Sequence, residues 1–256
     1  MTATDVTVPA PVLDDGDATT TSTTRLTGLA LANARLMVRN PITLGYGIIL
    51  PLFPLGFVFA SGGQEESVAI AMSSVLIIAW LLPVYYNILS IIVSRRDELV
   101  LKRLRTGEAR DGELLLSMCL PGITIAMVIA ALAAIVTTAI GHPPESPATY
   151  MLAVLGGSAM CAALAVWTAS WTRNAEAAQM TSLPVFVLLM VGMIGQAVPE
   201  GAREYVALTP GGALDALARL SWGADADALK ASAVVVGWTC LAIWIARRSM
   251  RWEPRR

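Results

Sequence analysis

Residues 68–93 read VAIAMSSVLIIAWLLPVYYNILSIIV and carry no charged side chain. A helix needs about 20 consecutive apolar residues to cross the hydrocarbon core of a membrane. This stretch therefore predicts a membrane-spanning helix that is long enough to tilt. Further uncharged runs lie on both sides of it, at 40–64, 114–144, 146–172, 177–199 and 231–246.

The composition of the whole chain points the same way. Of its 256 residues, 55% are hydrophobic and 14% are charged, whereas a soluble domain has about 25% charged residues. Six buried helices in a soluble protein of this size would leave too few polar residues to cover them. We therefore predict an all-α polytopic membrane protein with six transmembrane helices. The predicted spans are 42–60, 68–93, 114–140, 149–172, 177–198 and 230–246.

Lysine and arginine are unevenly distributed among the segments between these spans. With a cytoplasmic N-terminus, fifteen of the 18 basic residues fall on the cytoplasmic side, and only Arg203, Arg219 and Lys230 fall outside. Cytoplasmic loops carry the excess of basic residues in membrane proteins. This predicts a multi-pass protein of the plasma (inner) membrane with both termini in the cytoplasm.

The chain outside the spans divides into short segments. Residues 1–24 are predicted to be a disordered cytoplasmic tail, because they are rich in Thr and Asp. Residues 25–40 are predicted to form an interfacial elbow helix, followed by the transmembrane domain at 41–248 and a basic tail at 249–256. The segment 199–229 contains Pro199, Pro210 and the pair Gly211–Gly212, with apolar residues between and after them. It predicts short amphipathic helices at the outer leaflet, with an ordinary apolar loop as the alternative.

The sequence lacks the residues that several kinds of chemistry require. No charged residue falls within a predicted hydrocarbon core, which argues against a proton-coupled carrier. No G-x-x-x-x-G-K-[ST] phosphate loop occurs, and the single histidine, His142, lies in a predicted loop. The three cysteines have no metal-ligand spacing, and the net charge of −1 argues against nucleic acid as a partner. We expect no enzyme activity, no metal site and no cofactor in this chain.

The predicted cytoplasmic segment 94–113 reads SRRDELVLKRLRTGEARDGE. Its leucines interrupt a dense run of charges of both signs, which suits a short helix that docks on a soluble partner. A basic loop that only sets the orientation of the protein is the alternative.

This segment and the predicted layout resemble the permease subunits of type-2 ATP-binding-cassette (ABC) exporters, especially actinobacterial drug-efflux permeases. Those proteins have six spans, an elbow helix and a charged loop with an arginine–acid pair followed by an LKRLR-like run. The matching residues here are Arg96, Asp97, Glu98, Leu101, Lys102, Arg103, Leu104, Arg105 and Thr106. The sequence departs from that pattern at Gly107, where the family commonly has proline.

The resemblance implies a division of labour between subunits. The nine residues above would couple this chain to a separate ABC ATPase subunit, which would bind ATP and Mg. A second permease unit, as a homodimer or as a sibling protein, would complete a pathway within the membrane lipid. That pathway would suit the efflux of a hydrophobic or amphipathic compound, such as a drug, natural product or lipid, and would fit a role in antibiotic resistance. The aromatic and polar residues expected near that pathway are Tyr46, Phe53, Phe57, Tyr85, Asn87 and Gln196.

Three other functions stay open at this stage. A self-powered secondary carrier would need an ion-binding residue that is essential for transport. A membrane-embedded enzyme, such as a lipid transferase, would need clustered acids or histidines near the interface. A non-transporting sensor or immunity protein would need no ATPase.

Overall fold

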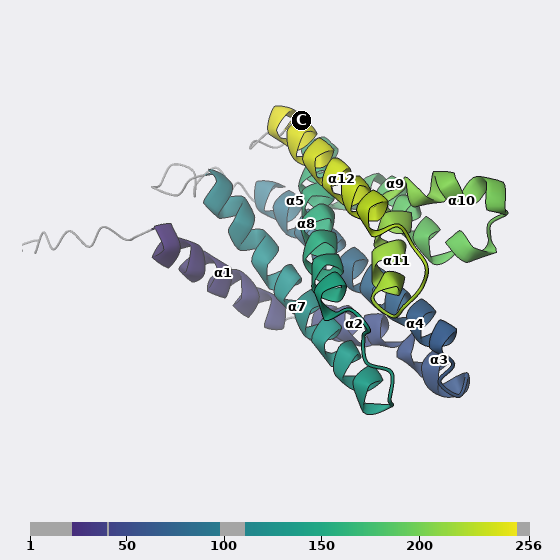
Figure 1. Cartoon of the computed structure of the whole chain (residues 1–256). Helices are drawn as coiled ribbons and strands as arrows, with labels where there is room; N and C mark the ends of the chain where they lie inside the picture. The colour runs from purple at the N-terminus through teal and green to yellow at the C-terminus, as the bar shows by residue number, and fades with distance from the viewer. Residues whose placement is uncertain (1–21, 40, 98–110, 250–256) are drawn as a thin grey trace, which may run out of the picture.

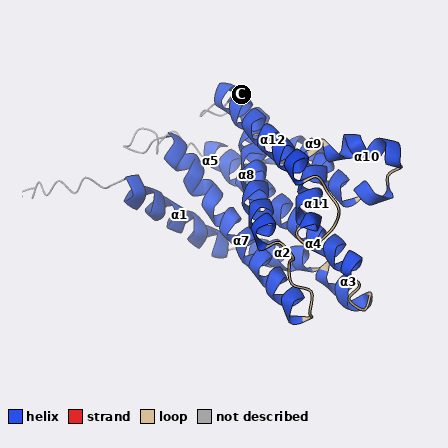
Figure 2. Ribbon diagram, in the orientation of Figure 1, coloured by secondary structure: helices blue, strands red, loops and turns tan. Residues whose placement is uncertain are grey.

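The computed structural model describes residues 22–39, 41–97 and 111–249, and these residues form helices and connecting turns without any strand (Figures 1 and 2). The helices are α1 (Ser22–Val38), α2 (Pro41–Leu52), α3 (Leu55–Ala60), α4 (Glu65–Ala79), the π-helix η1 (Trp80–Tyr86), α5 (Asn87–Asp97), α7 (Asp111–Ala139), α8 (Pro147–Trp171), α9 (Ala175–Met193), the 3-10 helix η2 (Gly195–Ala197), α10 (Glu200–Ala207), α11 (Pro210–Leu220) and α12 (Ala228–Ser249). The predicted all-α polytopic class is confirmed.

Five of these helices are long and apolar enough to cross a membrane: the continuous α4–η1–α5 unit, α7, α8, α9 and α12. They coincide with the last five predicted spans. The first predicted span, 42–60, is divided into α2 and α3 at Phe53 and Pro54. Proline lacks a backbone N–H donor and its ring clashes with the preceding turn, which ends α2 here. Together α2 and α3 would still extend about 30 Å, so six crossings stay a prediction.

The α4–η1–α5 unit is the centre of the bundle. In its most apolar window 72% of the residues are buried, against 17% for α12 at the periphery. Pro83 lies in the π-helical turn η1, whose longer-range hydrogen bonds accommodate the missing donor at membrane depth. The buried Tyr85 hydroxyl donates to Thr168 Oγ1 of α8 at 3.2 Å. The second span therefore organises the packing of its neighbours.

Two glycines allow the neighbouring helices to approach this unit closely. A Cβ atom on Gly157 of α8 would lie 2.4 Å from Cε2 of Trp80, and one on Gly122 of α7 would lie 2.2 Å from the carbonyl oxygen of Pro83. Small residues at helix contacts permit this kind of approach in membranes.

Adjacent glycines in α8 provide a matched test of this packing. We expect Gly157→Ala to lower the free energy of unfolding in detergent by about 2 kcal/mol, because overpacking forces a buried ring to move. Gly156→Ala meets only Val235 Cγ1 at 3.5 Å and is expected to leave stability unchanged or slightly raised. Equal unfolding free energies for the two variants would contradict the packing role of Gly157.

The C-terminal end of α5 lies at one end of the bundle, and short helices cover the other end. The prediction of helices within 199–229 is confirmed by α10 and α11, which lie on one side of the structure in Figure 1. Thr209 caps α11 by accepting a hydrogen bond from Gly212 N at 3.1 Å. A Cβ atom on Gly211 would lie 2.1 Å from the carbonyl oxygen of Leu189. The N-terminus of α11 is therefore in backbone contact with α9, and the helix packs into the bundle.

Candidate functional site

The last three residues of α5 connect it to helices distant in sequence. Arg96 is fully buried. Its Nη1 atom donates to the carbonyl oxygen of Ala169 at 2.9 Å, and Nη2 donates to those of Thr172 and, at 3.4 Å, Arg173. These carbonyls belong to the C-terminal end of α8 and the residues that follow it.

The chemistry of helix ends explains this arrangement. The last carbonyl groups of a helix have no partner within the helix, and the helix dipole places partial negative charge there. A guanidinium supplies several donors in a planar fork together with a positive charge. Arg96 therefore supplies donors to the carbonyl groups of the buried residues Ala169 and Thr172, and those acceptors stabilise its buried charge.

Asp97 makes the complementary contact with the next helix. Its Oδ2 atom accepts a hydrogen bond from the backbone N–H of Ala175, the first residue of α9, at 3.1 Å. A carboxylate is stabilised at a helix N-terminus by the free N–H groups and by the dipole. The Arg96–Asp97 pair thus binds the end of α8 with a cation and the start of α9 with an anion.

Arg95 connects α5 to the elbow helix. Its Nη2 atom donates to Oδ1 of Asn33 in α1. Asn33 is buried and donates through Nδ2 to the carbonyl oxygen of Ser117 in α7 at 2.9 Å. One amide side chain therefore joins α1, α5 and α7, and the interaction with α7 places the elbow helix along that span (Figure 1).

We call Asn33, Arg95, Arg96 and Asp97 the junction. It joins five helices, α1, α5, α7, α8 and α9, and it contains Arg96 and Asp97, the first two of the nine predicted coupling residues. A displacement of the C-terminal end of α5 would act on these helices together. Residues 95–97 are hydrogen-bonded to α1, to the end of α8 and to the start of α9, and α7 is joined to them through Asn33.

A comparison with known protein families indicates the kind of protein to which this junction belongs. Residues 26–194 match the family model of the ABC-2 type transporter, which covers more than half of the chain. The chain belongs to the ABC-2 type transporter family. This ABC-2 protein is therefore a membrane permease component, and its family in general works with an ABC ATPase. A search of curated protein sequences finds no match to the chain.

The matched region of this ABC-2 permease contains the junction and ends before α10. Of the predicted coupling residues, Arg96 and Asp97 belong to the junction. Glu98, Leu101, Lys102, Arg103, Leu104, Arg105 and Thr106 lie outside the described residues. Arg96 is fully buried and donates to carbonyl groups at the end of α8 and just after it, so its side chain is not part of an exposed surface in the described structure.

The predicted pathway residues whose side chains the structure describes differ widely in exposure. Tyr46, Phe53 and Phe57 are exposed along α2 and α3, with 65%, 74% and 69% of each residue accessible. Tyr85 is fully buried against α8, and Asn87 is half-buried at the start of α5. Gln196 lies in η2, and its side chain is outside the described part of the structure. Exposed aromatic residues on α2 and α3 are therefore the part of this set that a lipid or a second copy can contact.

A carboxylate on the other side of the bundle was missed by the sequence analysis. Ser73 Oγ of α4 donates to Oδ1 of Asp215 in α11 at 2.5 Å. Because α11 packs against α4, α8 and α9, this acid contacts the second span, although none of the predicted spans contains an acid. An acidic residue within the apolar stretch ALDALARL, four residues before Arg219 on the same helical face, is the sequence signal that marks it.

Proposed function

We propose that this chain is the permease subunit of an ABC exporter that moves a hydrophobic or amphipathic compound, such as a drug, natural product or lipid, out of the cell. A separate ATPase subunit would supply the energy from ATP and Mg. The ABC-2 family match supports the permease role. The observation that carries the coupling role is the junction, because it joins the start of the predicted coupling segment to four other helices.

In this proposal, nucleotide binding in the ATPase displaces residues 98–106, and the junction converts that displacement into a movement of the bundle. Arg96 and Asp97 hold the connection between α8 and α9, so these two helices would move with α5. Arg95 and Asn33 would carry the elbow helix and α7 with them. The junction residues are therefore positioning residues, and contact with the ATPase is assigned to 98–106.

The substrate pathway is assigned to the interface between two copies of the chain. Exposed aromatic side chains on α2 and α3 offer an apolar surface with a polar hydroxyl at Tyr46, which suits an amphipathic compound. Aromatic residues are also common at lipid-facing positions. The homodimer is therefore tested directly, by measuring the mass of the purified complex.

One observation favours a second candidate, the self-powered secondary carrier. Asp215 is a half-buried acid in contact with the second span, and carriers use acids within the membrane domain to bind a coupling ion. On that reading, Asp215→Asn would abolish transport in proteoliposomes that contain no ATPase. Absence of any transport by the wild-type chain under an ion gradient would remove this candidate.

The ATPase partner and the coupling segment are tested together. The chain is expressed with its genomic neighbours, and co-purification of an ABC ATPase in equal amounts is expected. The double variant Arg103→Glu/Arg105→Glu is expected to lower transport-coupled ATP hydrolysis at least about tenfold, because two charge reversals at one docking surface repel the partner. The matched control is Arg247→Glu/Arg248→Glu at the exposed end of α12, which should retain normal coupling. A chain that purifies without any ATPase under every nucleotide condition would overturn the proposal.

A further inference from the structure

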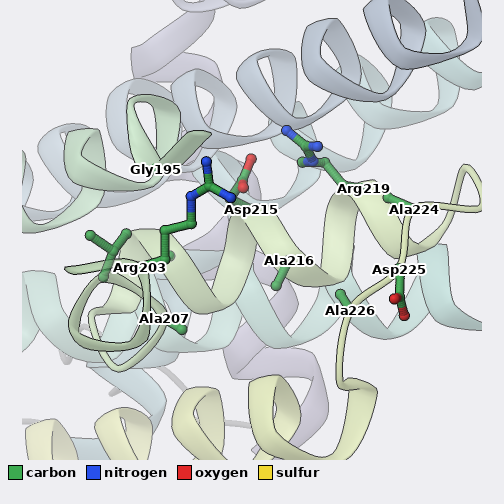
Figure 3. Close-up of a pocket in the computed structure, with 11 residues that line it drawn as sticks. Gly195, Arg203, Ala207, Asp215, Ala216, Arg219, Ala224, Asp225 and Ala226 are labelled. Atoms are coloured by element: carbon green, nitrogen blue, oxygen red, sulfur yellow. The ribbon is translucent and has the colours of Figure 1, made fainter. Parts of the chain in front are cut away.

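A pocket of about 190 Å3 lies between α10, α11 and residues 224–226, on the side of the bundle that the charge bias assigns to the outside (Figure 3). Its charged lining residues are Arg203, Asp215, Arg219 and Asp225. The other lining residues are glycine, alanine and valine. Small side chains leave the space open, so that charged groups of both signs face a cavity of molecular size.

The arginines of this pocket are unusual for their location. Only three basic residues are predicted on the outer side of the membrane, and two of them line this one cavity. Arg203 comes from α10 and is oriented by a hydrogen bond from Nε to the carbonyl oxygen of Val198 at 3.2 Å. Arg219 comes from α11. Two short helices thus bring two guanidinium groups to one site.

The half-buried carboxylate of Asp215 lies at the arginine end of the pocket. Figure 3 shows the guanidinium of Arg203 beside this carboxylate, with Arg219 further along α11. Burial raises the pKa of Asp215, whereas the hydrogen bond from Ser73 and the charge of Arg219 act in the opposite direction. Arg203 and Arg219 present two planar forks of donors at this end of the pocket, and such forks suit an anionic group with several acceptor oxygens. Asp225 lies at the other end, beside Ala224 and Ala226 (Figure 3).

The surroundings of the pocket are apolar and face outward. Tyr205 and Leu208 on and after α10, and Leu229 in the first turn of α12, are 75%, 52% and 82% exposed. Residue 226 lies two positions before α12, whose apolar stretch is long enough to enter the membrane. The cavity is therefore close to the membrane surface, with exposed apolar side chains near it that can contact hydrocarbon chains.

We propose that this pocket binds the zwitterionic headgroup of an amphipathic molecule, with its phosphate held by Arg203 and Arg219 and its ammonium group held by Asp225. Asp215, fixed by Ser73, positions the two arginines. The proposal concerns binding at the outer end of the bundle, and it is independent of the ATPase partner and of the direction of transport. Two sources share this chemistry: a membrane lipid of the phosphatidylethanolamine type, and a free phosphoethanolamine group.

The test measures lipid binding to the purified full-length chain by native mass spectrometry. Dioleoyl phosphatidylethanolamine is the probe, and dioleoyl phosphatidylglycerol, which lacks the ammonium group, is the comparison. We expect Arg219→Gln to weaken binding of both lipids by about tenfold, the effect of losing one charge-assisted hydrogen bond. We expect Asp225→Asn to weaken phosphatidylethanolamine by about the same factor while leaving phosphatidylglycerol unchanged.

Matched controls exist close to the pocket. Lys230→Gln removes the third outer basic residue, and Asp227→Asn removes an acid that accepts a hydrogen bond from the backbone N–H of Lys230; neither residue lines the cavity. Both controls should bind like the wild type. Thermal unfolding of each variant checks that the fold is retained. If Arg219→Gln and Asp225→Asn bind both lipids as tightly as their controls, the proposal is overturned.

A competition arm distinguishes the two sources. Phosphoethanolamine alone is added to the complex with phosphatidylethanolamine. Displacement at concentrations comparable to those of the lipid supports a site for the free headgroup, because the chains then contribute little. Retention of the lipid supports a lipid site, with the apolar residues beside the pocket in contact with the chains. Either result supports the pocket only if the charge variants show the expected losses.

Discussion

Replacing Arg96 with methionine is expected to lower the free energy of unfolding of the detergent-solubilised chain by about 3 kcal/mol. Methionine has a comparable length without charge or donors, so the main loss is the hydrogen bonds to the carbonyls of Ala169, Thr172 and Arg173. Those acceptors lie at the end of α8 and have no alternative donor within the helix. The measurement is equilibrium unfolding followed by circular dichroism.

Two controls separate this effect from a general loss of positive charge. Arg173→Met removes an exposed arginine next to the same site, and a change within about 0.5 kcal/mol is expected. Arg96→Lys keeps the charge and loses the planar fork of donors, so an intermediate loss is expected. A second readout is amide hydrogen exchange between α8 and α9, which should accelerate in Arg96→Met alone. If Arg96→Met is as stable as Arg173→Met, the junction does not hold these helices together.

Replacing Gly211 with alanine is expected to cost about 3 kcal/mol of unfolding free energy, at the upper end of overpacking effects. The new Cβ would lie 2.1 Å from the carbonyl oxygen of Leu189, and backbone cannot move aside as a side chain can. The facing residue of α9 shows the same constraint, since a Cβ on Gly192 would lie 2.2 Å from the carbonyl oxygen of Gly211. Thermal unfolding in one detergent measures both variants.

The losses of stability caused by the two glycine substitutions are expected to be non-additive. Gly192→Ala and Gly211→Ala would each separate α9 from α11, so the double variant should lose much less than the sum of the single losses. Gly201→Ala is the control, because a Cβ there meets nothing within 4 Å and α10 gains a better helix former. Destabilisation by Gly201→Ala equal to that of Gly211→Ala would mean that the close contact is unimportant.

The junction and the pocket beside α10 and α11 lie at opposite ends of the bundle. The junction lies where α5 ends, at the predicted coupling segment. The pocket that we propose for a zwitterionic headgroup lies where α10 and α11 cover the other end of the bundle. The α4–η1–α5 unit reaches both, since Ser73 contacts Asp215 and Arg96 binds the end of α8. A π-helical turn lies between these two contacts. In the proposed transport cycle, this central unit is the part of the chain through which one end can influence the other.

The long uncharged runs by themselves determined the membrane class and the positions of five apolar helices, because water cannot satisfy backbone groups in lipid and helices satisfy their own. The apolar residues of 199–229, set between prolines and glycines, likewise predicted the short helices. The division of the first span at Pro54 was harder to predict, since prolines of the same kind lie inside continuous α7 and α9. Whether a proline ends a helix or is tolerated inside it depends on the packing of the neighbouring helices, which the local sequence does not determine.

Only the tertiary structure decided the roles of the charged residues. In the sequence, Arg96 belongs to a cytoplasmic basic run and Asp215 to an outer loop, and both look exposed. The fold buries Arg96 because the end of α8, 73 residues further along, presents carbonyl groups without donors. It brings Asp215 to Ser73 because glycines let α11 pack against α9. Such partners come from distant parts of the chain and depend on three-dimensional packing, which the spacing of residues along one helix does not encode.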